Sequence, residues 1–168
     1  MNYATIKPCD IANGPGVRVS LFVSGCTHHC KDCFNREAWD FDYGLPFDQS
    51  VIDHILDLLN HDYIQGITYL GGEPMDPRNQ PGLLDLTRQI KARFPEKSIW
   101  AFTGYVWEAL PMVPEVTEEL VAGLDVLVDG PFIAEKKNLR LRFRGSENQR
   151  LIDVPKSLEA GKVVLWEE

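Results

Sequence analysis

Hydrophobic and polar positions alternate along this chain in blocks whose spacing predicts strands and helices in turn. The first block, Val17–Val23, is rich in β-branched and apolar residues and ends at Ser24 and Gly25, which predicts a strand. Between residues 48 and 60 the apolar positions recur at helical spacing. We expect Asp48 to cap this helix, because its carboxylate can accept hydrogen bonds from the exposed N–H groups of the first turn.

The same alternation continues through most of the chain. Further strands are predicted at residues 64–70, Ser98–Phe102 and residues 124–128, and the last is so uniformly apolar that both of its faces should be covered. Apolar spacing over residues 83–94 predicts a second helix, and residues 116–122 are expected to form a short third one. Strands that alternate with helices indicate parallel strands joined by crossover helices.

Residues that can carry chemistry stand just after the predicted strands. In chain order they are the cysteine-rich segment 26–33, the group Gly71, Gly72, Glu73 and Pro74, then Thr103 and Gly104, and finally Asp129 and Gly130. The carboxyl ends of parallel strands meet at one edge, and ligands bind at that edge in parallel α/β folds. The sequence therefore predicts one site assembled from four loops.

The length limits which architecture can hold this site. The chain has 168 residues, about one domain, and we expect residues 1–168 to form a single domain. A complete eight-unit barrel needs roughly 250 residues. The predicted fold class is therefore α/β, as a partial, open (β/α) barrel of mainly parallel strands or a short open sheet.

Composition and charge narrow the classes of function. Hydrophobic residues make up 44% and charged residues 25%, which is ordinary for a globular protein. No apolar run is long enough to cross a membrane, and residues 1–10 lack the pattern of a signal peptide, so we expect a cytoplasmic protein with no membrane contact. The net charge of −8 argues against nucleic acid as a partner. Residues 135–150 are the exception, with six basic and two acidic side chains.

Three of the four cysteines lie within eight residues, as Cys26, Cys30 and Cys33. In a reducing compartment such a group is typical of a metal site. Zinc is one alternative, with His28 or His29 as the fourth ligand. The other is an iron–sulfur cluster whose three cysteines leave one iron open for a substrate, and we expect Cys9 to stay outside the site in that case.

The ordered set of motifs resembles a known family. The motifs in this set are the cysteine triplet and residues 71–74, together with Asn13-Gly14-Pro15-Gly16, Thr103-Gly104-Tyr105, residues 126–130 and residues 144–149. This set resembles the radical S-adenosylmethionine superfamily, and more closely its glycyl-radical activases that serve anaerobic ribonucleoside-triphosphate reductase. The fold that the resemblance implies is a shortened radical S-adenosylmethionine barrel.

The resemblance also implies a reaction and the residues that support it. A 4Fe–4S cluster on the three cysteines would bind S-adenosylmethionine, cleave it reductively to methionine and a 5′-deoxyadenosyl radical, and so make a glycyl radical on the partner. Gly71, Gly72, Glu73 and Pro74 would surround the methionyl ammonium, with Thr103 also at the cofactor. Asp129 is expected either near the ribose or methionyl group or as the cap of a turn. The usual adenine-contacting aromatic is replaced by Asp32, and Phe34 is the nearby candidate.

The implied partners are anaerobic ribonucleoside-triphosphate reductase and a low-potential electron donor such as flavodoxin or ferredoxin. Arg140, Arg142 and Arg144 alternate with apolar residues, so we expect a strand with one basic face, in contact with the reductase or a phosphate-bearing ligand. Two alternatives stay open: an activase of another glycyl-radical enzyme such as pyruvate formate-lyase, and a zinc-binding adaptor without catalysis.

Overall fold

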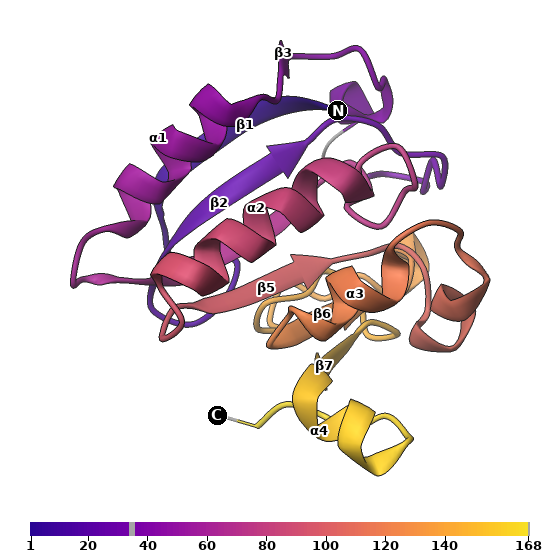
Figure 1. Ribbon diagram of the computed structural model, residues 1–168. Helices are drawn as coiled ribbons and strands as arrows, with labels where there is room; N and C mark the ends of the chain where they lie inside the picture. Colours follow the sequence, from indigo (N-terminus) through magenta and orange to yellow (C-terminus); the bar gives the residue numbers. More distant parts are fainter. Residues whose placement is uncertain (34–35, 168) are drawn as a thin grey trace.

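The computed structural model describes residues 1–33 and 36–167. These residues form one open sheet of seven strands in the order β3-β1-β2-β4-β5-β6-β7 (Figure 1). The strands are β1 (Asn2–Asp10), β2 (Val17–Val23), β3 (Leu45–Pro46), β4 (Ile64–Gly71), β5 (Ser98–Phe102), β6 (Val126–Asp129) and β7 (Arg150–Asp153). The predicted α/β class and the open sheet are confirmed.

The sheet has a parallel centre and antiparallel edges. β2, β4, β5 and β6 pair in parallel, whereas β1, β3 and β7 pair antiparallel with their neighbours. The expectation of mainly parallel strands therefore holds only for the four central strands. No apolar run predicted the edge strands, because half-exposed edge strands need none. Most of β1 is exposed or half-buried.

Three of the four α-helices lie where the apolar spacing predicted them, and the last one was not predicted. They are α1 (Gln49–Leu59), α2 (Gln80–Arg93), α3 (Thr117–Ala122) and α4 (Val154–Ala160), with short 3₁₀ helices η1 (Arg36–Trp39), η2 (Trp107–Met112) and η3 (Ala134–Lys136). Asp48 caps α1 as expected, since its side chain accepts from the N–H of Val51. None of the helices within residues 1–33 and 36–167 has the length and apolar character that a membrane crossing requires.

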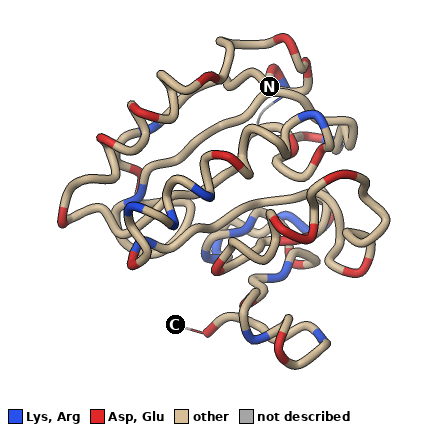
Figure 2. The backbone as a smooth tube through the Cα atoms, viewed as in Figure 1, with Lys and Arg blue, Asp and Glu red and all other residues tan. Residues whose placement is uncertain are grey.

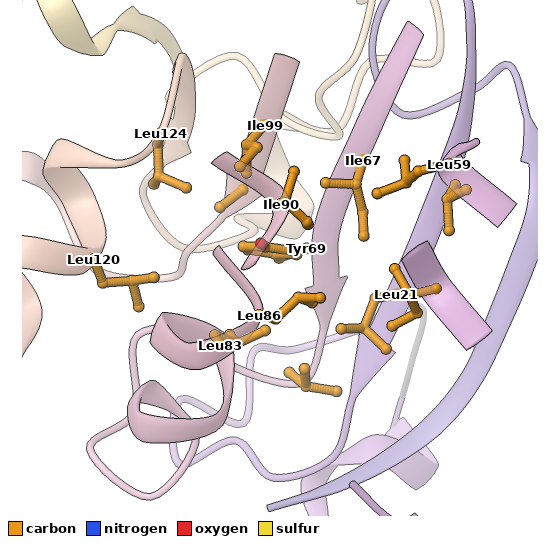
Figure 3. Close-up of a cluster of buried hydrophobic side chains, with 14 of the residues drawn as sticks. Leu21, Leu59, Ile67, Tyr69, Leu83, Leu86, Ile90, Ile99, Leu120 and Leu124 are labelled. Carbon is orange, nitrogen blue, oxygen red and sulfur yellow. The ribbon is translucent and has the colours of Figure 1, made fainter. Parts of the chain in front are cut away.

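The main core lies between one face of the sheet and α1, α2 and α3 (Figure 3). Leu21, Ile67 and Ile99 project from three adjacent parallel strands and are fully buried. Leu59 of α1 and Leu86 of α2 pack against them, as the labelled side chains in Figure 3 show. Each such side chain contributes about 1.5–3 kcal/mol through burial. This core fixes the carboxyl ends of the strands relative to one another.

The opposite face of the sheet is covered by a loop and by the chain terminus. Trp100, Val126 and Val128 form a second apolar cluster with Phe143, and Trp166 packs against it. Segment 138–149, which supplies Phe143, contains turns, bends and irregular backbone, with one isolated bridge between Ser146 and Lys137 and no strand. The predicted strand with a basic face is therefore wrong.

The physical reason lies in the hydrogen bonds of this segment. The side chain of Gln149 accepts from the N–H groups of Gly145 and Ser146, and Arg144 donates to the Gln149 carbonyl. Earlier in the segment the N–H groups of Arg140 and Leu141 donate to the side chain and the carbonyl of Asn138. These backbone groups are therefore bonded within the segment and not to a partner strand. Leu139, which the alternation placed on the apolar face, is 86% exposed.

Arg18 ties three parallel strands together from this second face. Its side chain is fully buried and donates to Thr68 Oγ1 at 3.0 Å, to the Ile67 carbonyl at 2.9 Å and to Ser98 Oγ at 2.8 Å. Burial lowers the pKa of this guanidinium to about 10. Thr68 in turn donates to the Asn13 carbonyl, so the same network holds the loop before β2.

Candidate functional site

The loops that follow β2, β4 and β5 contact one another at the carboxyl edge of the sheet. The backbone N–H of Gly72 donates to the Val23 carbonyl at 2.8 Å, and that of Glu73 donates to the Gly25 carbonyl at 2.7 Å. Thr103, directly after β5, donates through its hydroxyl to the Glu73 carboxylate at 2.8 Å. The cysteine loop, residues 71–74 and residues 103–104 therefore meet in space.

Glycine is required at two positions of this edge. Gly71 has a φ of +107°, which strains any residue with a side chain. At Gly72 an added Cβ would lie 2.5 Å from the Gly25 carbonyl oxygen, inside van der Waals contact. The pair therefore lets residues 71–74 press directly against the loop that carries Cys26.

The Glu73 carboxylate is the centre of the contacts. Its side chain is only 1% exposed and accepts four hydrogen bonds. The donors are His28 Nε2 (2.6 Å), the Gly104 N–H (2.7 Å), the Thr103 hydroxyl (2.8 Å) and the Met75 N–H (2.9 Å). The Glu73 hydrogen bond raises the pKa of His28 despite the opposing effect of burial. A buried carboxylate with this many donors joins the segments that supply them.

The three clustered cysteines lie on one half-buried loop, and no disulfide joins any of the four cysteines. Burial raises the pKa of the Cys26 thiol to about 11, although backbone N–H groups of His28 and His29 hydrogen-bond to it. Burial also raises the pKa of Cys30, against a hydrogen bond from the Phe132 backbone. Backbone donors aimed at cysteine sulfurs are a feature of iron–sulfur sites, where they tune the cluster.

The donor set fits an iron–sulfur cluster better than a single metal ion. Within the described residues no group of three His, Cys, Asp or Glu side chains is placed to hold one ion. A four-iron cluster is larger and takes one thiolate per iron, which suits three thiols spread over a loop. The candidate fourth zinc ligands are engaged elsewhere: His28 bonds to Glu73, and His29 stacks on Trp39 with ring centroids 4.3 Å apart.

Cys9 lies at the other end of the sheet. β1 runs antiparallel to β2, with Lys7 opposite Ser20 and Asp10 opposite Arg18, so Cys9 is near the start of β2. The cysteine triplet follows the end of that strand. The register therefore separates this exposed cysteine from the other three.

A cavity of about 450 Å³ opens on the loop-covered face of the sheet. Gly71, Gly72, Thr103 and Gly104 line it at the carboxyl edge, beside apolar side chains of β2, β4 and β5. Segment 138–149 forms the opposite wall and contributes Arg144. Arg142 lines a neighbouring cavity with Ile11, and Arg140 is exposed. Segment 138–149 thus borders the same cavity as three of the predicted cofactor residues, Gly71, Gly72 and Thr103, although the two are far apart in sequence. The other predicted site residues, namely Glu73, Pro74, Asp129 and the cysteine triplet, do not line this cavity.

Asp129 at the end of β6 is held in a network that the sequence did not indicate. Its side chain is 1% exposed and pairs with Arg150, with Asp129 Oδ1 3.1 Å from Arg150 Nε. It also accepts from the Trp107 N–H at 2.8 Å, and Arg150 bonds to Glu108 as well. Asp129 therefore orders the loop that follows β5. The pairing depends on antiparallel β7, for which no strand was predicted.

His28 is the other residue whose contacts sequence reasoning missed. A histidine inside a cysteine motif suggests a metal ligand or a polar loop residue, and spacing alone cannot show that it reaches Glu73.

Asp32, in the position of the expected aromatic, is exposed with a φ of 57°, and its carboxylate lies 3.8 Å from the Arg36 guanidinium. The adenine-contact candidate Phe34 lies outside the described residues.

The chain is similar to known proteins over most of its length. The model of the "4Fe-4S single cluster domain" family matches residues 12–152. The anaerobic ribonucleoside-triphosphate reductase-activating protein of Enterobacteria phage T4 is 43% identical over 153 residues, which cover 90% of this chain and 93% of the relative. The protein of the same name from Escherichia coli K12 is also 43% identical, over 89% of this chain and 96% of the relative. With a match this long to both, the chain belongs to the 4Fe–4S single cluster domain family and, within it, to the anaerobic ribonucleoside-triphosphate reductase-activating proteins.

Proposed function

We propose that this chain is a radical S-adenosylmethionine enzyme that activates anaerobic ribonucleoside-triphosphate reductase by generating a glycyl radical on it. The observation that carries the proposal is the direct attachment of the three-cysteine loop to residues 71–74 at the mouth of a cavity. Such an arrangement can hold a cluster beside a small molecule. The near full-length similarity to reductase-activating proteins supports the choice of partner.

Cys26, Cys30 and Cys33 would hold a 4Fe–4S cluster that has one iron without a protein ligand. When bound, the cluster supplies the electron that cleaves S-adenosylmethionine to methionine and a 5′-deoxyadenosyl radical. The protein's contribution is to orient the cofactor and to exclude water from the reacting atoms. Phe22, Leu70 and Phe102 give the cavity an apolar lining suited to that exclusion.

The cofactor would lie along the carboxyl edge, with its methionyl group at Gly71, Gly72, Glu73 and Pro74. Gly71 and Gly72 line the cavity without side chains, so their backbone is accessible from it. The Glu73 carboxylate is 1% exposed and does not line the cavity, so it would contribute negative charge near an ammonium group without direct contact. Thr103 orients the Glu73 carboxylate through its hydroxyl. Asp129 would act at this site through the loop after β5, which it holds by accepting from the Trp107 N–H.

We further propose that the sheet is a shortened, open (β/α) barrel of the radical S-adenosylmethionine type that forms a single domain over residues 1–168. Four parallel strands with helices on one face and the cavity on the other support this assignment. We also propose a cytoplasmic location, because a reducing compartment would keep the three clustered thiols available to a cluster. A low-potential donor such as flavodoxin or ferredoxin would supply the electron.

The basic segment is proposed to orient the reductase. Residues 135–150 carry six basic side chains in a chain of net charge −8, and acidic positions are spread over most of the remaining chain (Figure 2). Arg140 and Arg142 are exposed, and Arg142 lines the neighbouring cavity. Both would steer an acidic surface of the partner toward the site. Arg144, which faces the cavity itself, would meet whatever part of the partner or cofactor enters it.

The test is direct. The reconstituted, reduced protein is mixed with S-adenosylmethionine and anaerobic ribonucleoside-triphosphate reductase without oxygen, and electron paramagnetic resonance is recorded. A glycyl radical signal that requires all three components is the expected result. A signal with pyruvate formate-lyase in place of the reductase would favour the other activase, and a colourless, zinc-loaded protein would favour the adaptor.

A further inference from the structure

His28 is the only side chain of the cysteine loop that the structure shows bonded to Glu73 within residues 1–33 and 36–167. Its ring is held from three directions. Nε2 donates to Glu73 Oε1 at 2.6 Å, and the ring meets the Tyr105 ring edge-on with centroids 4.6 Å apart. An added Cβ on Gly104 would lie 2.5 Å from His28 Cδ2, so the absence of a side chain there makes room for the imidazole.

The same glutamate holds the cysteine loop a second time. The Glu73 backbone N–H donates to the Gly25 carbonyl at 2.7 Å, so the loop is attached to Glu73 at Gly25 and again at His28. Cys26 lies between these two attachments. On its other side the loop is bonded to η1, because the Gly25 and Cys26 N–H groups donate to the Ala38 and Trp39 carbonyls.

We infer that His28 is a positioning residue that fixes the cysteine loop, and with it Cys26, relative to residues 71–74 of the cofactor site. This role rests on the proposed function, because the cysteine loop and residues 71–74 need a fixed separation only if a cluster and a cofactor meet between them. The attachment itself is a property of the chain without either group. A hydrogen bond to a charged acceptor is strong enough to affect loop opening about tenfold or more.

The first test uses the metal-free, reduced protein. Hydrogen exchange is measured at the Gly25, Cys26 and Glu73 amides in wild type and in His28→Ala, and we expect these amides to exchange about tenfold faster in the variant. His28→Gln should restore most of the protection, because its amide nitrogen can still donate to Glu73. Gly104→Ala should reproduce the loss, because its new methyl group displaces the imidazole.

The matched control is His29→Asn. His29 lies next in the chain but stacks on Trp39, and asparagine tolerates its φ of 49°. The control should leave exchange at the Gly25, Cys26 and Glu73 amides unchanged. If His29→Asn raised exchange as much as His28→Ala, the effect would be a general loosening of the loop, and the assignment of His28 would be overturned.

The second test uses the reconstituted protein. His28→Ala should hold as much iron and sulfide as wild type, since the three cysteines remain, but should bind S-adenosylmethionine about tenfold more weakly by titration of the cluster spectrum. Unchanged affinity would remove His28 as a positioning residue for the site. Tighter binding would show that His28 competes with the cofactor for Glu73. If wild type itself does not bind S-adenosylmethionine, the proposed function fails, while the exchange experiment still decides the attachment.

Discussion

Removal of the Glu73 carboxylate should destabilise the protein even when no cluster or cofactor is bound. Glu73→Ala deletes the acceptor of four hydrogen bonds at a side chain that is 1% exposed. Two of the donors are backbone N–H groups, of Met75 and Gly104, and these cannot move away to find another acceptor. We therefore expect Glu73→Ala to lower the free energy of unfolding of the protein itself, in addition to any effect on cofactor affinity.

The decrease in the free energy of unfolding can be worked out from the hydrogen bonds that Glu73 accepts. Each bond to a charged acceptor contributes about 1.5–3 kcal/mol, and an orphaned buried donor costs about 1–3 kcal/mol. These contributions are not additive, and water can enter the space that the side chain leaves. We therefore expect Glu73→Ala to lower the free energy of unfolding by about 3–5 kcal/mol, which is less than their sum. For a chain of this length each kcal/mol lowers Tm by roughly 2–4 °C, which gives a decrease on the order of 10 °C.

The assay is thermal unfolding of the metal-free, reduced protein followed by circular dichroism. Glu96→Ala is the control, since this exposed glutamate follows α2 and its loss should change stability by no more than about 0.5 kcal/mol. A double-mutant cycle with His28→Ala should give a coupling of about 1–2 kcal/mol between the two side chains. A decrease in Tm of Glu73→Ala no larger than that of Glu96→Ala would refute the reasoning.

Three further predictions follow from the other parts of the site. Alanine at any cysteine of the triplet should abolish cluster assembly, whereas Cys9→Ala should not; iron and sulfide content after reconstitution decides this. The double variant Arg140→Gln with Arg142→Gln should activate the reductase more slowly, and added salt should reproduce this defect in wild type. Cleavage of S-adenosylmethionine without the reductase should be unchanged in the double variant. If its activation rate were as sensitive to salt as that of wild type, the steering role would be contradicted. Arg150→Met should destabilise the protein by roughly 2 kcal/mol in thermal unfolding, because it leaves the buried Asp129 carboxylate with a weaker partner set, and Asp129→Asn in the same chain should recover most of the loss.

The amino-acid sequence determined the central part of the fold. Val17–Val23 and Ser98–Phe102 are short runs in which apolar and β-branched residues predominate, and such runs form strands in a sheet that is covered on both faces. Helical spacing and the Asp48 cap located α1 within one residue of its observed ends. These features depend on neighbours along the chain, so local patterns are sufficient to predict them. The cysteine spacing and residues 71–74 are local in the same sense.

Only the tertiary structure decided which distant groups meet. Glu73 contacts His28 and Thr103 because the register of β2, β4 and β5 aligns the ends of these strands, and no local pattern encodes that register. Segment 138–149 shows the opposite case. Its period of two predicted a strand, but Asn138 and Gln149 accept backbone hydrogen bonds within the segment, which forms a loop that lines the cavity. Asp129 forms an ion pair with Arg150 because the antiparallel register of β6 and β7 places the two residues opposite each other. Hydrogen bonds and ion pairs between residues far apart in sequence depend on packing of the whole chain, and so they became visible only in the fold.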